Sequence, residues 1–431
     1  MLGPRRRGAP MTSLAGAVRA PLEANRRVLA AGTFALLGLI DIVFGHFAAR
    51  GDATFALSLA NASVHVPSVH APAAATAYAA GAVSLALAAV RAAVDPGQRA
   101  KRAMIAAVLL CFLIALLCWA DAGKIPLSLV NLLQNTVVGS IPLILGALAG
   151  CLCERSGVIN IAIEGQLLLG AFAAAVVGSA FGVLWLGLIS GSLAGGLLGL
   201  VLAVFAIRYL VDQIVLGVVL NLLASGLTGY LYDRALTTHQ NTLNSPQTFS
   251  AIKIPLLGDI PVIGPVFFDS TIFLYITYVM IILVQVGLFS TRWGLRVRAV
   301  GEHPTAADAV GIRVLATRYR NVILGGLVAG IGGAWLTIGS VGAFGKDMSS
   351  GMGYIALAAL IFGRWRPLGA VAAALLFGFT GTLQSILSTL NVPIPSNILL
   401  MTPYVATIVA VAGLVGRGRP PRADGKPYIK S

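Results

Sequence analysis

Long apolar runs recur along most of this chain, and they limit it to one class of fold. A helix that crosses the ~30 Å hydrocarbon core of a bilayer needs about 20 predominantly apolar residues. Runs of about this length lie near 28–48, 73–94, 104–120, 127–150, 164–181, 183–207, 213–231, 270–290, 321–340, 368–390 and 398–416. A further run at 352–362 is too short for a full crossing, so we expect it to be extended by its flanks or broken. The sequence therefore predicts an all-α, polytopic transmembrane helical bundle of about 10–12 spans with one broken helix.

The composition excludes an ordinary soluble domain. Apolar residues make up 58% of the chain and charged residues only 10%, whereas soluble domains carry about a quarter charged residues. The formal net charge of +15 would fit a nucleic-acid ligand if the charges were gathered on one surface. The positions of the lysines and arginines argue against that interpretation.

The basic residues sort by side of the membrane. Alternating the spans from a cytoplasmic N-terminus places 25 of the 30 lysines and arginines on the inner side. The five outside are Arg50, Lys124, Arg234, Lys253 and Lys346. Because inner loops of membrane proteins carry such an excess, we expect both termini to be cytoplasmic. The chain is then expected to contact a lipid bilayer and no nucleic acid.

The longest outer segment, residues 232–269, is rich in turn-forming residues and cannot be a span. Its prolines and glycines are Pro246, Pro255, Gly258, Pro261, Gly264 and Pro265. Such residues are typical of surface loops with a defined shape. We expect this segment to form a folded cap or gate on the outer face.

The stretch CERSGVINIAIEGQLLLGAF, Cys153 to Phe172, interrupts what would otherwise be one long helix. Two adjacent charges, Glu154 and Arg155, stand at the inner end of a span, and polar or helix-breaking residues follow at Gly157, Asn160, Glu164 and Gly165. Non-helical backbone at membrane depth is tolerated only where it is buried in protein or borders a water-filled cavity. A carboxylate there needs a partner or a polar path. The stretch is either such a cavity or gate, or an interfacial loop leading into the next helix.

The inner loop from Thr291 to Arg320 contains signals for a short capped helix. Pro304 suits the first turn of a helix, and Gly311 suits its C-terminal cap. The sequence TAADAV between them predicts a helix of about two turns, flanked by arginines. This helix fits a partner's groove, and the alternative is a basic loop that touches anionic headgroups.

Amide side chains within the spans are candidates for a solute pathway. Asn131 and Asn135 are four residues apart and share a helix face. Buried amides at the midplane either bind the hydroxyls or base edges of a solute or form interhelical hydrogen bonds. The full set of pathway candidates is Asn131, Asn135, Asn160, Glu164 and Asn221.

Motifs of covalent chemistry are missing. The chain has no Gly-rich loop ending in GK[ST], no HExxH and no GxSxG, and its five histidines and four cysteines do not resemble a metal site. We therefore expect no catalytic residue, no metal and no bound cofactor. Energy for transport would come from another chain or from an ion gradient, and Asp41 and Glu164 are the carboxylates that would serve ion coupling.

Several segments, in order along the chain, resemble the permease subunits of bacterial ABC importers of the simple-sugar and nucleoside type, which are related to the branched-chain amino-acid permeases. They are ERSGVINIAIEGQLLLGAF, DQIVLGVVLNLLASGLT, GLRVRAVGEHPTAADAVGI, GYIALAALIFGRWRPLGA and AGLVGRGRPPRADGKPY. The resemblance covers residues 127–428. It implies an N-terminal extension at 1–120 with about two or three extra spans, a permease core at 121–416 and a cytoplasmic basic tail at 417–431.

The resemblance implies a multi-pass subunit of the bacterial cytoplasmic (inner) membrane that is not itself an enzyme. Its partners would be a cytoplasmic ABC ATPase that uses ATP, a second permease, usually a paralogue, and an extracytoplasmic solute-binding lipoprotein. A nucleoside, with purine nucleosides favoured, or a simple sugar would be the substrate. The residues that fall on the family's ATPase-coupling loop are Arg298, Gly301, Glu302, Pro304, Ala307 and Gly311. An ion-coupled secondary transporter of a small polar solute is the alternative.

Overall fold

The computed structural model describes residues 12–48, 51–59, 65–123, 126–390 and 419–430, together with positions 392, 395, 398 and 401. Within these residues, ten helices are long and apolar enough to cross a membrane, and one apolar helix, Met352–Phe362, is shorter. The polytopic helical prediction is therefore confirmed. The run predicted at 398–416 lies outside the described residues, apart from positions 398 and 401.

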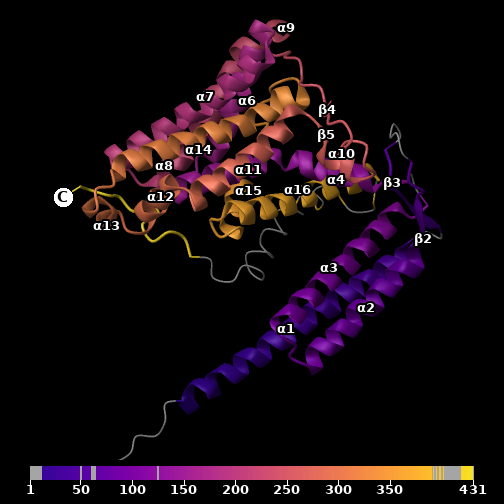
Figure 1. The fold of residues 1–431 in the computed structure, drawn as a ribbon. Helices are drawn as coiled ribbons and strands as arrows, with labels where there is room; N and C mark the ends of the chain where they lie inside the picture. The colour runs from indigo at the N-terminus through magenta and orange to yellow at the C-terminus, as the bar shows by residue number, and fades with distance from the viewer. Residues whose placement is uncertain are drawn as a thin grey trace, which may run out of the picture. The chain divides into compact units, whose positions relative to one another are not determined.

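The chain divides into two compact units. The first contains Met1–Ser58, His65–Leu129 and Thr389–Val392, and the second contains the remainder. Three helices that pack side by side dominate the first unit, α1 (Thr12–Phe47), α2 (Ala73–Ala93) and α3 (Gln98–Asp121), as Figure 1 shows. The contact between α1 and α2 is close because Gly38 and Gly81 face one another there.

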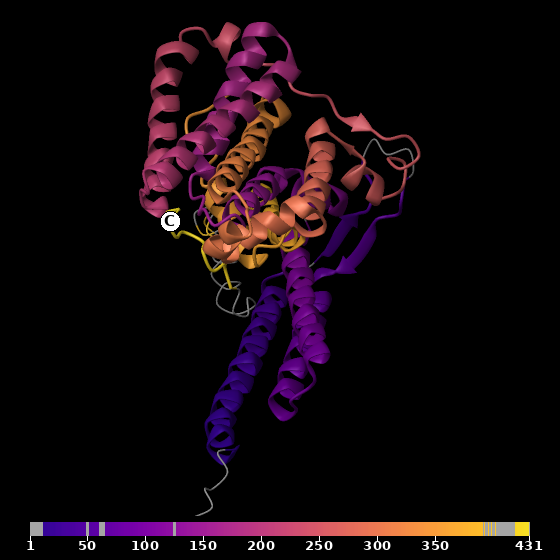
Figure 2. The same ribbon diagram turned by 60° about the vertical axis from the view of Figure 1, so that its left-hand side comes forward.

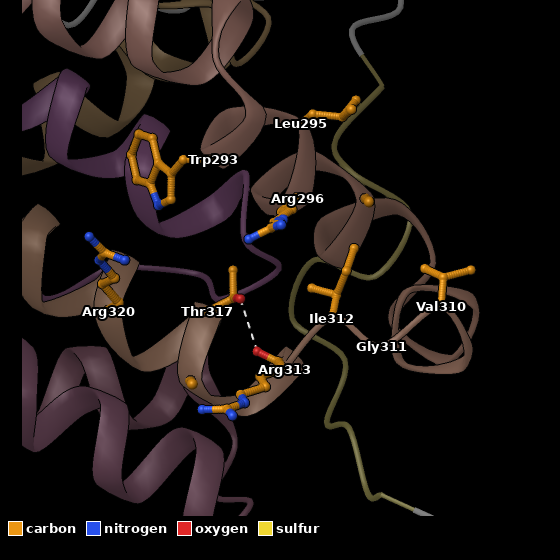
Figure 3. Close-up of a pocket in the computed structure, with 11 residues that line it drawn as sticks. Trp293, Leu295, Arg296, Val310, Gly311, Ile312, Arg313, Thr317 and Arg320 are labelled. Atoms are coloured by element: carbon orange, nitrogen blue, oxygen red, sulfur yellow. Dashed lines mark hydrogen bonds between the residues drawn. The ribbon is translucent and has the colours of Figure 1, made fainter.

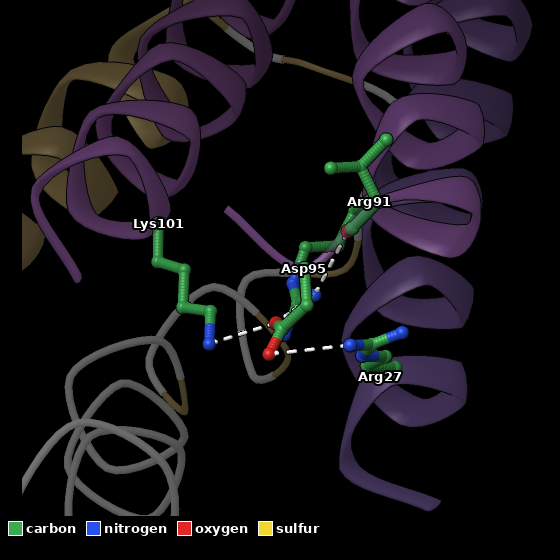
Figure 4. Close-up of polar contacts among 5 residues, drawn as sticks. Arg27, Arg91, Asp95 and Lys101 are labelled. Atoms are coloured by element: carbon green, nitrogen blue, oxygen red, sulfur yellow. Dashed lines mark hydrogen bonds and ion pairs between the residues drawn. The ribbon is translucent and has the colours of Figure 1, made fainter. Parts of the chain in front are cut away.

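A cluster of opposite charges joins these three helices (Figure 4). The carboxylate of Asp95 lies 3.4 Å from Arg27, 3.0 Å from Arg91 and 2.8 Å from Lys101. The hydrogen bond from Lys101, more than any other contact, lowers the pKa of Asp95. One carboxylate between α2 and α3 thus contacts cations from all three helices.

Short strands at the other end of this unit were not predicted. β1 (Asp52–Ala56) pairs antiparallel with β2 (Val69–Pro72) and parallel with β3 (Leu127–Ser128). Thr54 uses its backbone N–H to donate to the buried Asp121 carboxylate at 2.7 Å. Strands of two to five residues are too short to show a period in the sequence, which explains why an all-α chain was expected.

The second unit is built almost entirely of helices (Figures 1 and 2). The long ones are α6 (Ile163–Phe181), α7 (Leu184–Ala203), α8 (Gln213–Leu231), α11 (Ile272–Ser290), α14 (Val314–Leu336) and α16 (Pro367–Thr389). The shorter ones are α4 (Leu129–Gly139), α5 (Ile141–Glu154), α9 (Gln240–Leu243), α10 (Ile263–Phe267), α12 (Arg292–Glu302), α13 (Pro304–Ala309) and α15 (Met352–Phe362). Single π-helical turns extend α7, α8 and α14 at their C-terminal ends, at Val204–Arg208, Tyr232–Leu236 and Thr337–Val341. The spans predicted between residues 127 and 390 are thus found, with 127–150 divided into α4 and α5 at Ser140.

A seam of glycines joins α7 to α14 and α6. A Cβ atom on Gly195 would meet the backbone of Gly326 and Gly330, and one on Gly330 would meet the backbone of Gly191. On the other side, a Cβ on Gly170 of α6 would also meet the backbone of Gly330. The helices therefore touch backbone to backbone, as small residues permit in membranes. Gly326 and Gly330 are therefore packing residues of this seam.

The second unit keeps the predicted inner and outer charges apart. At one end, Arg155 donates from Nε to the carbonyl of Trp365 at 2.7 Å, and Arg318 donates from Nη1 to the carbonyl of Lys426 at 2.9 Å. At the opposite end of the unit, Lys346 follows the C-terminal end of α14 and Asp233 follows that of α8. Their side chains form an ion pair at 2.7 Å. Residues assigned to the inner side by charge thus contact one another.

The outer segment is folded, as predicted. Within it, β4 (Ile252–Lys253) pairs with β5 (Asp269–Ser270), and the hydroxyl of Tyr275 donates to the carbonyl of Ile252 at 2.6 Å. The Asn244 side chain donates to the carbonyl of Phe344 at 3.0 Å and accepts from its N–H at 2.7 Å. The segment is therefore tied both to α11 and to the residues that follow α14.

The glycine seam predicts an unequal response to two identical substitutions. Gly330→Ala places a methyl group inside the backbone contact with α7, so we expect a loss of about 1–3 kcal/mol of stability. Gly226→Ala, in α8, adds a methyl group with no neighbour within 4 Å. Thermal unfolding of the detergent-purified permeases measures the difference, and equal midpoints for the two variants would refute the seam.

Candidate functional site

The predicted break between α5 and α6 is present, and it is held by buried side chains. Asn160 is fully buried and donates to Cys153 Sγ at 3.4 Å and to Gln166 Oε1 at 3.1 Å. The N–H of Ile159 donates to Gln213 Oε1 of α8 at 2.8 Å. Asn160 therefore shapes the break from within the protein, and its side chain does not line an open path.

Glu164, in the first turn of α6, binds the N-terminus of α15. Its carboxylate accepts hydrogen bonds from the hydroxyl of Ser349 at 2.7 Å, from the N–H of Gly351 at 2.8 Å and from the N–H of Gly353 at 2.6 Å. The first N–H groups of a helix have no partner within the helix, and a negative charge near them is favourable. The partner that this carboxylate was expected to need is thus a helix terminus.

The length of α15 places Glu164 near the middle of the membrane. α15 has eleven residues, so it rises about 16 Å, roughly half of the hydrocarbon core. Just after its C-terminal end, the carbonyl of Trp365 accepts from Arg155, on the predicted cytoplasmic side. Its N-terminal end, where Glu164 binds, therefore lies about halfway across. This confirms that the 352–362 run belongs to a broken crossing.

Asn221 of α8 joins the same group of residues. Its Oδ1 accepts from the N–H of Gly165 at 2.8 Å, and its Nδ2 donates to the carbonyl of Ile161 at 2.9 Å and to the hydroxyl of Tyr354 at 3.1 Å. Tyr354 keeps 48% of its surface exposed. The structure thus brings Asn221 and Glu164 together and adds Tyr354, which the sequence did not single out.

A polar row continues from Asn221 toward the outer end of α8. One turn further along, the hydroxyl of Ser225 donates to Asp347 at 2.5 Å, and beyond it Lys346 pairs with Asp233. We define the polar row by its paired members, Asn221 with Tyr354, Ser225 with Asp347, and Asp233 with Lys346. Polar and charged groups at membrane depth are costly in lipid. The exposed face of this row therefore borders water or another protein.

The two asparagines of α4 lie elsewhere. Asn131 and Asn135 are exposed, and Gln134 beside them donates to the carbonyl of Asp269, at the end of the outer segment, at 3.3 Å. The expectation that these amides are buried at the midplane is therefore wrong. Their four-residue spacing correctly predicted that they lie on one face of the helix. The sequence did not show that this face is exposed.

On the cytoplasmic side, the short helix predicted between Pro304 and Gly311 is present as α13. Pro304 occupies its first turn, and Gly311 ends it with a φ of +84°, a backbone conformation that favours glycine. Ala307 faces inward, buried against Val300 and Val314. The opposite face carries exposed small or apolar side chains, of which Val310 is 76% exposed. An apolar face on the inner surface suits a partner's groove.

Other residues of the predicted coupling set have structural contacts. Arg298 lies over the ring of Phe289, 5.0 Å from its centroid, and Arg155 lies over the same ring at 5.5 Å. Gly301 packs directly against the carbonyl of Arg155. Glu302 accepts from the N–H of Arg422 at 3.4 Å. These residues connect the loop to α5, α11 and the C-terminal segment.

A basic groove of about 730 Å³ lies beside α13 (Figure 3). Trp293 lines it from α12 and Val310 from the end of α13. Three arginines contribute charge to its walls, Arg296, Arg313 and Arg320. The hydroxyl of Thr317 donates to the carbonyl of Arg313 at 2.9 Å and fixes the start of α14. The groove and the exposed face of α13 together make one surface that combines apolar side chains with positive charge.

Asp41, the other carboxylate considered for ion coupling, lies in the first unit. It is fully buried in α1 and accepts from the hydroxyl of Ser84 in α2 at 3.3 Å. This contact agrees with a hydrogen-bonded aspartate between two helices.

Comparison with known proteins gives a consistent result. The family model described as "Branched-chain amino acid transport system / permease component" matches residues 132–415. The guanosine ABC transporter permease NupQ of Bacillus subtilis is 43% identical over 68% of this chain and 95% of its own. The nucleoside permease NupC of Lactococcus lactis is 39% identical over 71% and 100%, and the putative glucose permease TsgC13 of Haloferax volcanii is 34% identical over 65% and 85%.

The first two organisms each have a second, more distant relative of the same kind, at 30% and 24% identity. No solved structure matches the chain. The family match covers most of the chain from α4 onward, and it includes the break, α8 and the α12–α14 loop. The chain therefore belongs to the ABC-transporter permease family of the branched-chain amino acid transport type and is a multi-pass permease subunit of the cell membrane.

Proposed function

We propose that this permease forms the membrane pathway of an ATP-driven nucleoside importer, with purine nucleosides as its first candidates. The observation that carries this proposal is the polar row, which reaches from the outer end of α8 to Asn221 near mid-membrane. The names of two relatives specify guanosine and nucleoside transport, and the name of a third specifies glucose. A simple sugar is therefore the second candidate, since it offers the same hydroxyls as a ribose.

The residues of the site divide into two roles. Asn221 and Tyr354 present an amide and a phenol beside the exposed face, and such groups hydrogen-bond to ribose hydroxyls and base edges. The Tyr354 ring also offers a surface on which a base stacks. Glu164 and Asn160 keep the break in shape, because the Glu164 carboxylate accepts from the start of α15 and Asn160 Nδ2 donates to Gln166. Asn131 and Asn135 are exposed beside Gln134, which donates to the end of the outer segment.

Partner chains supply what this subunit lacks. We propose that a cytoplasmic ABC ATPase binds the exposed face of α13 and hydrolyses ATP, so this chain binds no cofactor. A second permease covers the polar row; the two different relatives in each of two organisms support a paralogue in that role. An extracytoplasmic lipoprotein delivers the solute to the outer segment. Closure of the ATPase displaces α13, and α14 carries the displacement toward the pathway.

Asn221 is expected to be required for uptake. Asn221→Ala removes the hydrogen bonds to Gly165 and Tyr354. Because losing hydrogen bonds worth about 1.4 kcal/mol corresponds to a factor of ten, we expect nucleoside uptake to fall about tenfold or more. Gln240→Ala, an exposed amide in α9, is the matched control and should leave uptake unchanged. Uptake of labelled guanosine and labelled glucose by cells with the complete transporter measures both variants and the choice of solute.

The same assay separates an ATP-driven importer from an ion-coupled one. Uptake should stop when ATP is depleted and continue when a protonophore dissipates the proton gradient. Uptake that follows the proton gradient would overturn the proposal.

Glu164→Gln is expected to lower both stability and uptake. The substitution removes the negative charge at the N-terminus of α15 and turns an amide NH₂ toward backbone N–H groups, which costs about 1–3 kcal/mol for an unsatisfied buried donor. Asp347→Asn, at an exposed position with one hydrogen bond, should cost less. Thermal unfolding compares the two, and an unchanged midpoint for Glu164→Gln would contradict the role given to this carboxylate.

Val310→Arg is expected to weaken binding of the ATPase. The change places a bulky charge on the apolar face of α13, where a partner must close over it. Leu256→Arg is the matched control, because Leu256 is 85% exposed in the outer segment. Co-purification of the ATPase with each permease, at equal permease levels, measures the effect. Equal recovery of the ATPase with both variants would rule out α13 as the docking helix.

A further inference from the structure

The last described segment, residues 419–430, folds back onto the inner face of the second unit (Figure 1, yellow). The N–H of Ala423 donates to the carbonyl of Gly301 at 2.9 Å, at the end of α12. The buried Arg318 of α14 donates from Nη1 to the carbonyl of Lys426 at 2.9 Å. The segment was predicted only as a basic tail, and the structure shows that it bonds to the coupling loop, Thr291 to Arg320, both at the end of α12 and in α14.

Tyr428 contacts all three helices of that loop. Its side chain is 7% exposed and packs with Val300 of α12, Ala307 of α13 and Val314 of α14. Its hydroxyl also hydrogen-bonds to the carboxylate of Asp308, in α13. One aromatic side chain of the tail therefore belongs to the apolar cluster on which α13 rests.

Asp424 connects the tail to α5. Its carboxyl group hydrogen-bonds to the carboxyl group of Glu154, which also accepts from the indole N–H of Trp365. Burial, followed by the neighbouring Glu154, raises the pKa of Asp424 to about 9. Two buried carboxyl groups in contact do not both ionise near neutral pH, so they hold one proton between them.

The tail also touches the break that follows α5. Gly425 has a φ of +73°, and a Cβ atom there would lie 2.7 Å from the side chain of Ile159. A Cβ atom on Gly157 would lie 3.1 Å from the carbonyl oxygen of Ala423. Only a chain without side chains at these two positions comes so close to the break. The tail thus lies between α13 and the break and contacts both.

We propose that residues 422–428 form a clasp that positions α13 against the break between α5 and α6, with Tyr428 holding α13 and Asp424 holding α5. Both are positioning residues, because neither borders the polar row. The inference rests on the proposed function in one respect, that the ATPase acts on α13. With the clasp closed, a displacement of α13 reaches the break through the tail as well as through α14.

Hydrogen exchange of the full-length permease in nanodiscs tests the clasp without any solute or ATPase. Tyr428→Ala and Asp424→Ala should raise exchange in residues 303–313 about tenfold, because α13 loses its support. Ile429→Ala is the matched control, since the neighbouring Ile429 is 74% exposed, and it should change nothing. Faster exchange in the tail alone, with 303–313 unchanged, would overturn the proposal.

Conservative variants guard against a failure to fold. Asp424→Asn keeps a donor toward Glu154 and should retain slow exchange in 303–313, whereas Tyr428→Phe loses only the bond to Asp308 and should give an intermediate rate. If the alanine variants do not accumulate, equal exchange in wild type and Tyr428→Phe would count against the clasp.

The clasp should also loosen as pH rises. In the attached tail, Asp424 keeps its proton up to about pH 9, whereas in the detached tail it releases the proton near pH 4. The attachment of the tail therefore weakens as the pH rises from about 4 to about 9. The groups that face Asp424 are Glu154 and Cys153 of α5 and Arg318 of α14. Protection factors of the wild-type tail should fall between about pH 6 and pH 9, while those of Asp424→Asn stay level. A level wild-type profile would contradict the shared proton.

Transport in proteoliposomes then links the clasp to coupling. Tyr428→Ala should lower nucleoside uptake per ATP hydrolysed by about fivefold or more, compared at equal amounts of assembled permease–ATPase complex. If the wild type imports no nucleoside, the proposed function fails while the exchange result stands. If the wild type imports nucleosides and the variant has the wild-type ratio, the clasp fails and the proposed function stands.

Discussion

A helix that begins inside a bilayer needs partners for its first backbone N–H groups. In this permease, the position of α6 and the break between α5 and α6 depend on that requirement. α15 begins at about mid-membrane, where an unsatisfied N–H costs several kcal/mol. Glu164 accepts from two of these groups. Because the carboxylate must be at that depth, α6 has to start beside α15, and the chain between α5 and α6 has to leave the helical path. Asn221 then donates to the carbonyl of Ile161 in this detour, and Asn160 joins the detour to the Gln166 side chain of α6.

Local signals in the sequence were sufficient for some of these features. Apolar runs of one bilayer thickness predicted the spans, and Pro304 and Gly311 predicted α13, because each depends only on near neighbours. The partners of Glu164 lie 185 to 189 positions away, in a segment with no pattern of its own. The same holds for Asp424, whose partner is in α5. The prediction that Asn131 and Asn135 are buried failed for another reason. The spacing of two residues shows that they share a helix face, but it does not show whether that face is buried or exposed.

Arginines on the inner side have two distinct uses, which a charge count does not separate. Arg155 and Arg298 lie over Phe289, and Arg318 is buried against the tail. These three hold the loop, the tail and the helix ends together. Arg296, Arg313 and Arg320 line the open groove, where they meet solvent or a partner. The positive-inside pattern thus includes both the internal supports of the coupling surface and the charge that it presents.

The glycine seam has a mechanical consequence. Where α7, α6 and α14 touch backbone to backbone, no side-chain rotamer is available to absorb a displacement, so we expect the three helices to move together as one unit. α14 starts in the α12–α14 loop, and the residues just after its C-terminal extension lead to the N–H groups that bind Glu164. This unit therefore extends from the α12–α14 loop at one end to the polar row at the other. α8 packs less closely toward its C-terminal end, because a Cβ atom on Gly226 or Gly229 would meet no atom within 4 Å.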